Sequence, residues 1–150
     1  MTDKWDGRFL EMARVVSTWS KDPSSCVGAI VVDEHRSMVA EGYNGLVRGA
    51  DDDLDFLRDR EYKYERTIHA EMNAIFAAGR TGVKLSGTTM YVFGLPVCHH
   101  CALGISQVGV RRVVVGFSRD KDLRQWADEW NVSRSIFTEA GVEFECVVVE

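Results

Sequence analysis

The chain has 150 residues, of which 45% are hydrophobic and 27% are charged, and its formal net charge is −5. These values are typical of a globular protein, so we expect residues 1–150 to fold as one domain with a sizeable core. The acidic balance argues against binding of a nucleic-acid polymer, which usually requires a basic surface. The apolar runs are far too short to span a bilayer, so we expect no membrane association.

The first part of the chain predicts a helix followed by a hairpin. Apolar residues recur with a helical period from Trp5 to Ser20, and the polar segment Asp22 to Ser25 interrupts them. Cys26 to Val32 is apolar and rich in β-branched residues, and Met38 to Tyr43 follows the polar turn Asp33 to Arg36. We therefore expect an antiparallel pair of strands here.

The middle of the chain begins with its least regular stretch. Asn44 to Arg66 is dense in Asp and Arg, and we expect a surface loop with a short helical turn. A helix is predicted from about His69 to Ala78, with Gly79 as its end. The pattern then predicts a strand from Thr88 to Phe93 and a helix from about Cys98 to Val108.

The last part of the chain continues this alternation. It predicts a strand from Arg112 to Val115, a helix from about Leu123 to Ala140 closed by Gly141, and a strand from Phe144 to Val149. The order α-β-β-α-β-α-β-α-β favours right-handed crossovers and parallel pairing in the second half. We expect an α/β fold in three α/β/α layers, built on a five-stranded mixed sheet. Ligands of such folds collect at strand ends where helices begin.

Two short motifs supply the residue types of a zinc site. His69 is followed two residues later by Glu71, and Cys98 is followed three residues later by Cys101. One histidine and two cysteines give three protein ligands and leave the fourth tetrahedral position open, as in catalytic rather than structural zinc sites. Because two helix starts would meet here, their positive ends would favour the thiolate form of the cysteines. The spacing predicts zinc-activated hydrolysis.

Glu71 is the candidate proton carrier of this site. Its place two residues after His69 makes it a poor ligand for the same ion, but it can reach a water molecule and a substrate. A carboxylate so placed can take a proton from water and deliver it to a ring nitrogen and a leaving amine. His-x-Glu with Cys-x-x-Cys is the layout of zinc deaminases.

Other interpretations of the histidines and cysteines remain open at this point. A Cys-x-x-Cys pair can be redox-active or belong to a structural zinc site, although His99 and His100 would point away from Cys98 and Cys101.

The remaining cysteines and the start of the chain bear on the compartment. Met1 to Asp6 lacks the apolar core of a secretory signal, so we expect a cytoplasmic protein in which the cysteine pair binds metal. Cys26 and Cys146 adjoin apolar runs, and we expect both to be buried bystanders.

Several further segments carry a family resemblance. They are Ser20-Lys21-Asp22-Pro23-Ser24, Val27 to Val32, Gly42-Tyr43-Asn44-Gly45, Ile68 to Ile75 and Cys101 to Val110. With them the chain resembles the deoxycytidylate (dCMP) deaminases of the cytidine deaminase-like superfamily over nearly its whole length. The first and third segments are not shared by zinc deaminases at large, so they narrow the resemblance to this branch.

The resemblance implies hydrolytic deamination of dCMP to dUMP, with release of ammonia. It implies that His69, Cys98 and Cys101 bind one Zn²⁺ per subunit and that Glu71 shuttles protons.

The resemblance also implies substrate contacts and an assembly. Asn44 matches the asparagine that hydrogen-bonds the substrate, and the backbone around Ala70 would meet the base. Without the resemblance, Asn44-Gly45 would be interpreted as a turn, because both residues tolerate left-handed conformations. Family members are usually homo-oligomers, often hexamers, so we expect a hexamer or a dimer. Trp126 and Trp130, four residues apart, are candidate association residues that could equally face the core.

The chain departs from the family pattern at three places. Val97 stands between Pro96 and the first cysteine, Leu46-Val47 replaces an aromatic residue and a proline, and Ser25-Cys26 replaces a small polar and a basic residue. These departures put regulation by dCTP and dTTP in doubt more than the chemistry, since proline at a helix start is tolerated rather than required.

The nucleotide and its phosphate contacts are not decided by the sequence. Lys21, Arg48, Lys63 and Arg66 could reach the site, but each taken singly is expected to be a solvated surface charge. Alternatives to dCMP are cytidine, cytosine, dCTP and adenosine in transfer RNA. A non-catalytic zinc- or nucleotide-binding protein is the alternative from another class.

Overall fold

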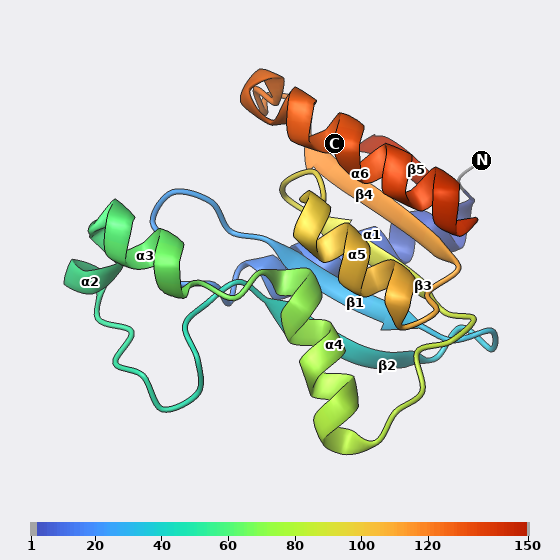
Figure 1. Ribbon diagram of the computed structural model, residues 1–150, viewed down its shortest axis with the longest axis horizontal. Helices are drawn as coiled ribbons and strands as arrows, with labels where there is room; N and C mark the ends of the chain where they lie inside the picture. Colours follow the sequence, from blue (N-terminus) through green and yellow to red (C-terminus); the bar gives the residue numbers. More distant parts are fainter. Residues whose placement is uncertain (1–2, 150) are drawn as a thin grey trace.

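The computed structural model describes residues 3–149 and contains a five-stranded sheet in the order β2-β1-β3-β4-β5 (Figure 1). The strands are β1 Gly28–Val32, β2 Met38–Tyr43, β3 Thr89–Phe93, β4 Arg112–Ser118 and β5 Glu143–Val149. β1 is antiparallel to both β2 and β3, whereas β3, β4 and β5 are parallel. The predicted hairpin, the parallel second half and the mixed five-stranded sheet are confirmed.

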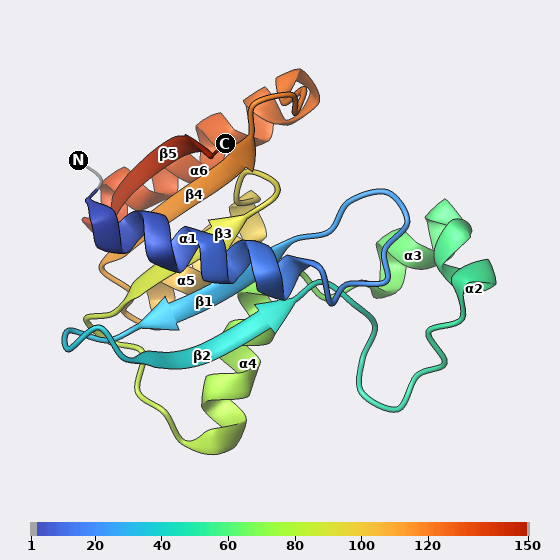
Figure 2. The same ribbon diagram turned by 180° about the vertical axis from the view of Figure 1, so that it is seen from behind.

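Helices cover both faces of this sheet. They are α1 Lys4–Ser17, α2 Leu54–Arg58, α3 Arg60–Arg66, α4 Ala70–Thr81, α5 His99–Gln107 and α6 Ala127–Ala140. α4, α5 and α6 lie on the face seen in Figure 1, and α1 crosses the opposite face, seen in Figure 2. The predicted three layers are therefore confirmed. None of the described helices is both long and apolar enough to span a membrane.

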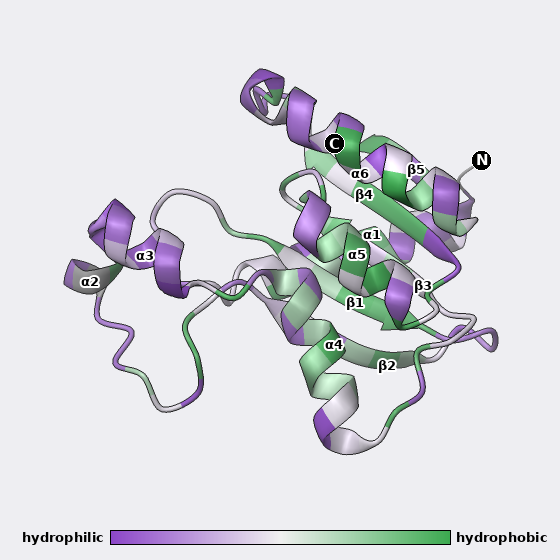
Figure 3. Ribbon diagram, viewed as in Figure 1, coloured by the Kyte–Doolittle hydropathy of each residue, from purple (hydrophilic) through white to green (hydrophobic). Residues whose placement is uncertain are grey.

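The central strands are buried on both faces, so they are almost uniformly apolar (Figure 3). Successive side chains of a strand point to opposite faces. Val31 and Val92 accordingly contribute to the core beneath α4, α5 and α6, while Ile30 and Tyr91 contribute to the core beneath α1. The sheet thus separates two cores and fixes the helical layer that carries the predicted site.

A glycine sets how closely α4 approaches the sheet. A Cβ atom on Gly42 of β2 would lie 2.4 Å from the backbone nitrogen of Ala74 and 2.5 Å from the carbonyl oxygen of Ala70. Only glycine permits this backbone contact, which holds the first turn of α4 against β2. The position of His69, immediately before that turn, depends on this contact.

Several element boundaries differ from the sequence prediction. α4 runs through Gly79 and ends at Gly82, which adopts a left-handed conformation (φ 76°) and closes the helix. Packing of α4 against the sheet tolerates a glycine within the helix, whereas a left-handed residue must end it. The segment after Asn44 forms two short helices, α2 and α3, and a 3₁₀ turn, Arg124–Trp126, precedes α6.

The prediction of buried positions for Cys26 and Cys146 is wrong, because both are exposed. Cys26 lies in the loop before β1, and Cys146 lies on the edge strand β5.

An ion pair joins α1 to the sheet at the end remote from α2 and α3. The buried carboxylate of Asp6 accepts two hydrogen bonds of 2.8 Å from Arg112 and one of 2.7 Å from the Tyr91 hydroxyl. Burial raises the pKa of Asp6, but the hydrogen bonds from Arg112 and Tyr91 outweigh it and hold the pKa at about 2.

The contact at Gly42 predicts a stability change. Gly42→Ala should lower the free energy of unfolding by roughly 1–3 kcal/mol, because the added methyl group meets the backbone of α4. Gly79→Ala, with open space around the same addition, should raise it by about 0.5–1 kcal/mol. Urea unfolding measures both changes, and equal effects of the two substitutions would contradict the close packing.

The ion pair at Asp6 predicts how stability depends on acid. The pKa of Asp6 is lower in the folded than in the unfolded chain, so its stabilisation is present above about pH 4 and lost as the pH falls through 2. Asp6→Asn should flatten the decline in unfolding free energy between pH 4 and pH 2 by about 2 kcal/mol. Asp122→Asn, which removes an exposed ion pair with Arg124, is the control and should change little. An unchanged acid decline in Asp6→Asn would contradict this assignment.

Candidate active site

Two helices begin at residues that carry metal-ligand atoms. His69 is the residue before the first turn of α4, and Cys98 is the residue before the first turn of α5. The imidazole of His69 makes no capping hydrogen bond, whereas the Cys98 sulfur accepts one from the backbone nitrogen of Cys101 at 3.4 Å. The sequence placed these residues at helix starts, and the structure confirms that placement.

The donor atoms of these residues converge. Nδ1 of His69 lies 3.3 Å from Sγ of Cys98 and 3.4 Å from Sγ of Cys101. A tetrahedral zinc site, with Zn–S bonds of about 2.3 Å and Zn–N bonds of about 2.0 Å, has N···S separations of about 3.5 Å. All three ligand atoms lie within 4.8 Å of one another. The donor set and its spacing therefore fit a zinc ion.

The three groups shift one another's pKa values. The hydrogen bond with Cys101 lowers the pKa of the Cys98 thiol to about 4, and the same contact raises the pKa of Cys101 far above its ordinary value. The contact with Cys98 raises the pKa of His69 to about 9. Metal binding would release these protons, because zinc ligands are thiolates and neutral imidazole.

Glu71 lies in the first turn of α4 and is 4% exposed. Burial raises the pKa of its carboxyl group to about 6, although the neighbouring charge of His69 opposes the shift. A carboxyl group whose pKa lies near neutrality can both take and return a proton. This matches the chemistry that the sequence predicts for Glu71.

These groups open into a cavity of about 210 Å³. Its inner wall includes His69, Ala70 and Glu71 from the start of α4 together with Cys98. The remaining walls come from the loop before β1, Asn44, α3 with Thr67, the segment before α5, and Trp126 with Glu129. The cavity is therefore assembled from segments far apart in the sequence.

Asn44 also lines the cavity, where its side chain braces the loop before β1. Its Oδ1 accepts a hydrogen bond of 2.9 Å from the backbone nitrogen of Val27, and its Nδ2 donates one of 2.8 Å to the carbonyl oxygen of Ser25. Among the described residues other than glycine, only Arg36 has a positive φ, so Asn44 does not adopt the left-handed turn conformation. One acceptor lone pair and one N–H of its amide remain for a ligand.

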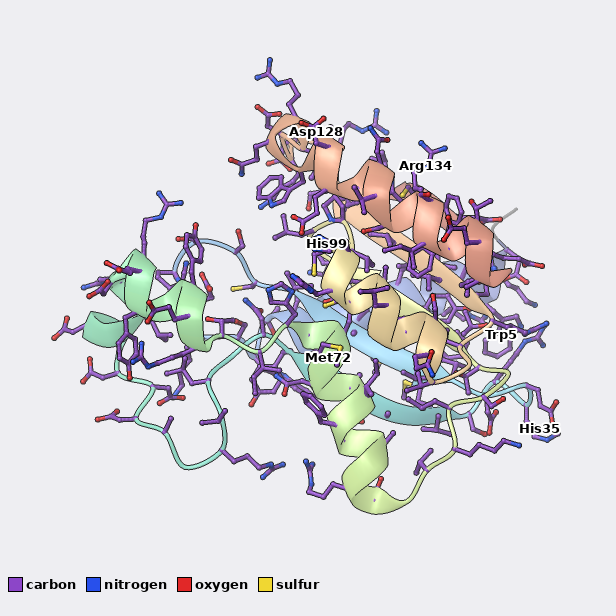
Figure 4. The ribbon with its side chains drawn as sticks, viewed as in Figure 1. Trp5, His35, Met72, His99, Asp128 and Arg134 are labelled. Carbon is purple, nitrogen blue, oxygen red and sulfur yellow. The ribbon has the colours of Figure 1, made fainter. Side chains whose placement is uncertain are left out.

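The histidines between the two cysteines are not part of the metal group. His99, labelled in Figure 4 at the start of α5, has its Nδ1 3.2 Å from Oε1 of Glu129 on α6, and its ring contacts that of His100. The described residues contain one group able to hold a metal, and it comprises His69, Cys98 and Cys101.

Among the residues that line the cavity, Asp22, Trp126 and Glu129 have no role there that the sequence predicts, whereas Lys63 is one of the four cations expected within reach of the site. Asp22 stood in a segment that carried the family resemblance, but no role was assigned to it. Lys63 was expected to be a solvated charge, and this is wrong because it is 3% exposed. Trp130 packs edge-on against Phe144, which favours a core position over an association surface for this residue.

The fold has three α/β/α layers, and a helix that starts at His-x-Glu meets a helix that starts at Cys-x-x-Cys. These features define the cytidine deaminase-like class. The profile of the family described as the cytidine and deoxycytidylate deaminase zinc-binding region matches residues 3–117. Human deoxycytidylate deaminase is 38% identical over 94% of this chain and 78% of the human protein. The chain belongs to the deoxycytidylate deaminase family.

Two further comparisons concern a deaminase of nearly the same length and a solved structure of the same fold. An uncharacterized deaminase from the luxG 3′ region of Aliivibrio fischeri is 41% identical over 95% of this chain and 93% of its own length. The crystal structure of the dCMP deaminase of cyanophage S-TIM5 with dCMP and dUMP has a TM-score of 0.78 and 24% identity, covering 98% of this chain and 99% of that chain. This likeness supports the fold.

The converging donor atoms predict the effect of removing one. Cys98→Ser should weaken zinc binding by more than about 100-fold, because the remaining ligands no longer supply two thiolates. Cys26→Ser removes an exposed thiol outside the group and should leave the zinc content unchanged. Elemental analysis of the dialysed proteins measures zinc, and full occupancy in Cys98→Ser would contradict the ligand assignment.

Proposed function

We propose that this protein is a zinc-dependent hydrolase that converts dCMP to dUMP and ammonia. One observation carries the proposal most strongly. The chain aligns over 94% of its length with a deoxycytidylate deaminase. In addition, His69, Glu71 and Cys98 line one cavity, and Cys101 completes the metal group with His69 and Cys98. The cavity lies at helix starts, where α/β folds commonly bind ligands.

His69, Cys98 and Cys101 are proposed to hold the zinc ion. The N···S separations of 3.3 and 3.4 Å and the open fourth position of a three-ligand set support this role. When bound, zinc lowers the pKa of a water molecule and so supplies a nucleophile at neutral pH.

Glu71 is proposed to move the protons of the reaction. Its buried carboxylate would take a proton from the attacking water and deliver it to the ring nitrogen of cytosine. It would then assist departure of the amine as ammonia. Burial supports this role because it keeps bulk water from competing for the proton.

Asn44 and the backbone of Ala70 are proposed to hold the substrate. Asn44 lines the cavity with one N–H and one lone pair left for a ligand, and its position is fixed by Val27 and Ser25. Ala70 is fully buried at the start of α4, where the first backbone N–H groups lack partners within the helix.

The family resemblance supports a proposal about assembly and compartment. We propose a cytoplasmic homo-oligomer, a hexamer or a dimer, of chains that each form one domain. Phe76 on α4 and Leu103 on α5 are more than half exposed, which supports an association surface on the helical face.

Other deaminase substrates are the nearest alternatives. Cytidine, cytosine and dCTP share the reacting base, and adenosine in transfer RNA is a further candidate that the net charge of −5 disfavours. A binding protein without turnover would bind nucleotide but release no ammonia, and the buried Glu71 argues against it.

A panel of substrates tests the proposal. Ammonia release should be fastest from dCMP when free bases, nucleosides, nucleotides and transfer RNA are compared, with and without dCTP. A higher kcat/KM for any other member would replace dCMP as the substrate. Calorimetric binding of dCMP without ammonia release would contradict the proposed activity.

The role of Glu71 predicts a separation between metal binding and turnover. Glu71→Gln should reduce kcat for dCMP by about 10²–10⁴-fold, because the amide cannot accept and return the proton. Its zinc content should stay at the parent value, since Glu71 is not a proposed ligand. Turnover at the parent rate would disprove the proton-transfer role.

A further inference from the structure

Lys63 is an unusual residue for the wall of a cavity because its charge is almost fully buried. Its side chain is 4% exposed, and its Nζ lies 3.1 Å from Oδ1 of Asp22, whose side chain is 9% exposed. Removing such a pair from water carries a desolvation cost that hydrogen bonds must offset. The pair is also 41 residues apart in sequence, so it joins α3 to the loop that precedes β1.

Both ends of this pair are fixed by the backbone. Oδ1 of Asp22 also accepts hydrogen bonds from the backbone nitrogens of Ser24 at 2.8 Å and Ser25 at 3.0 Å. The carbonyl oxygen of Lys63 accepts hydrogen bonds from the backbone nitrogen and the hydroxyl of Thr67, at 2.9 and 2.7 Å. The ammonium group is therefore held in one place before any ligand arrives.

The ammonium group retains capacity to donate. A lysine Nζ carries three N–H donors, and within the part of the chain that the structure describes its hydrogen-bond partner is Asp22. The ring of Tyr64 lies 5.4 Å from the Nζ. A ligand in the cavity can thus receive hydrogen bonds from a desolvated cation.

The charges around the cavity single out Lys63. Among the described residues that line the cavity, no lysine or arginine other than Lys63 is present. Asp22, Glu71 and Glu129 are the acidic residues of the lining. A phosphate monoester is an anion and binds most strongly through charge-assisted hydrogen bonds.

The cavity is lined from one side by α3, which carries Lys63, and from another by the start of α4. Ser24, Ser25 and Tyr64 line both the cavity and an exposed depression outside it, so they mark its mouth. His69 and Glu71 line the cavity but not the depression, so they mark its inner end. Lys63 also lines the cavity but not the depression, and it reaches the cavity from α3, whereas His69 and Glu71 belong to the start of α4, so a ligand between the two helices can meet both sets of groups.

We propose that Lys63, positioned by Asp22, binds the phosphate of the nucleotide and makes the protein select a nucleotide over its nucleoside. This inference rests on the proposed deamination of dCMP. Arg60 and Lys121 line the exposed depression, but Asp120 and Asp122 line it as well. Arg60 is exposed and Lys121 is only partly buried, so water competes for their hydrogen bonds and they offer weaker discrimination than a buried ammonium.

Deamination of dCMP and deoxycytidine by the zinc-loaded enzyme tests the proposal. In Lys63→Met, kcat/KM for dCMP should fall by about 10- to 100-fold, the usual effect of losing a hydrogen bond to a charged group. For deoxycytidine it should change by less than about threefold, because this substrate has no phosphate. Lys84→Met, an exposed lysine outside the cavity, is the matched control and should change neither value. Lys63→Arg should restore part of the discrimination.

Binding of the product gives a readout independent of turnover. Calorimetry should show weaker binding of dUMP to Lys63→Met by a similar factor and unchanged binding of deoxyuridine. If Lys63→Met does not fold, Lys63→Gln removes the charge while keeping a polar side chain, and the same comparison applies.

Three results separate the possible failures. Equal losses for dCMP and deoxycytidine would show that Lys63 is only structural and would overturn the proposal. Loss of discrimination in Lys121→Met but not in Lys63→Met would place the phosphate in the exposed depression and would also overturn it. A parent enzyme that releases no ammonia from dCMP would instead refute the proposed function, on which this inference rests.

Discussion

The site depends on one constraint, which is that two helices must start at the same place. His69 precedes α4 and Cys98 precedes α5, so each helix presents a donor atom together with the positive end of its dipole. At Cys98 that electrostatic environment favours thiolate over thiol, which zinc binding requires. A shift of either helix along its axis would separate donor atoms that now lie 3.3 and 3.4 Å apart.

Packing against the sheet holds the starts of α4 and α5 in place. α5 follows β3 directly, whereas α4 is held by backbone contact with Gly42 of β2, and β1 connects these two strands. Dense packing of both sheet faces resists sliding of the helices, because cores of this kind transmit rather than absorb displacement. The ion pair of Asp22 and Lys63 joins the loop before β1 to α3, and both segments line the cavity. The proposed metal ligands, the proposed proton carrier and the cavity thus rest on one packed scaffold.

Much of this architecture could be predicted from sequence because its signals are local. The element order and the helix starts at His69 and Cys98 follow from short apolar periods and neighbouring breakers. Burial of Lys63 could not be predicted, since it depends on Asp22, 41 residues away. Gly79 misled the prediction because packing tolerates glycine inside α4. Glu129 reaches the cavity from α6, and no motif marks its approach.

We propose above all that one histidine and two cysteines at converging helix starts hold the zinc of a catalytic site. X-ray absorption at the zinc edge tests this claim most directly on the purified enzyme. The account predicts a four-coordinate ion with two sulfur neighbours at about 2.3 Å and two nitrogen or oxygen neighbours at about 2.0–2.1 Å. Four sulfur neighbours, or a shell without sulfur, would contradict it.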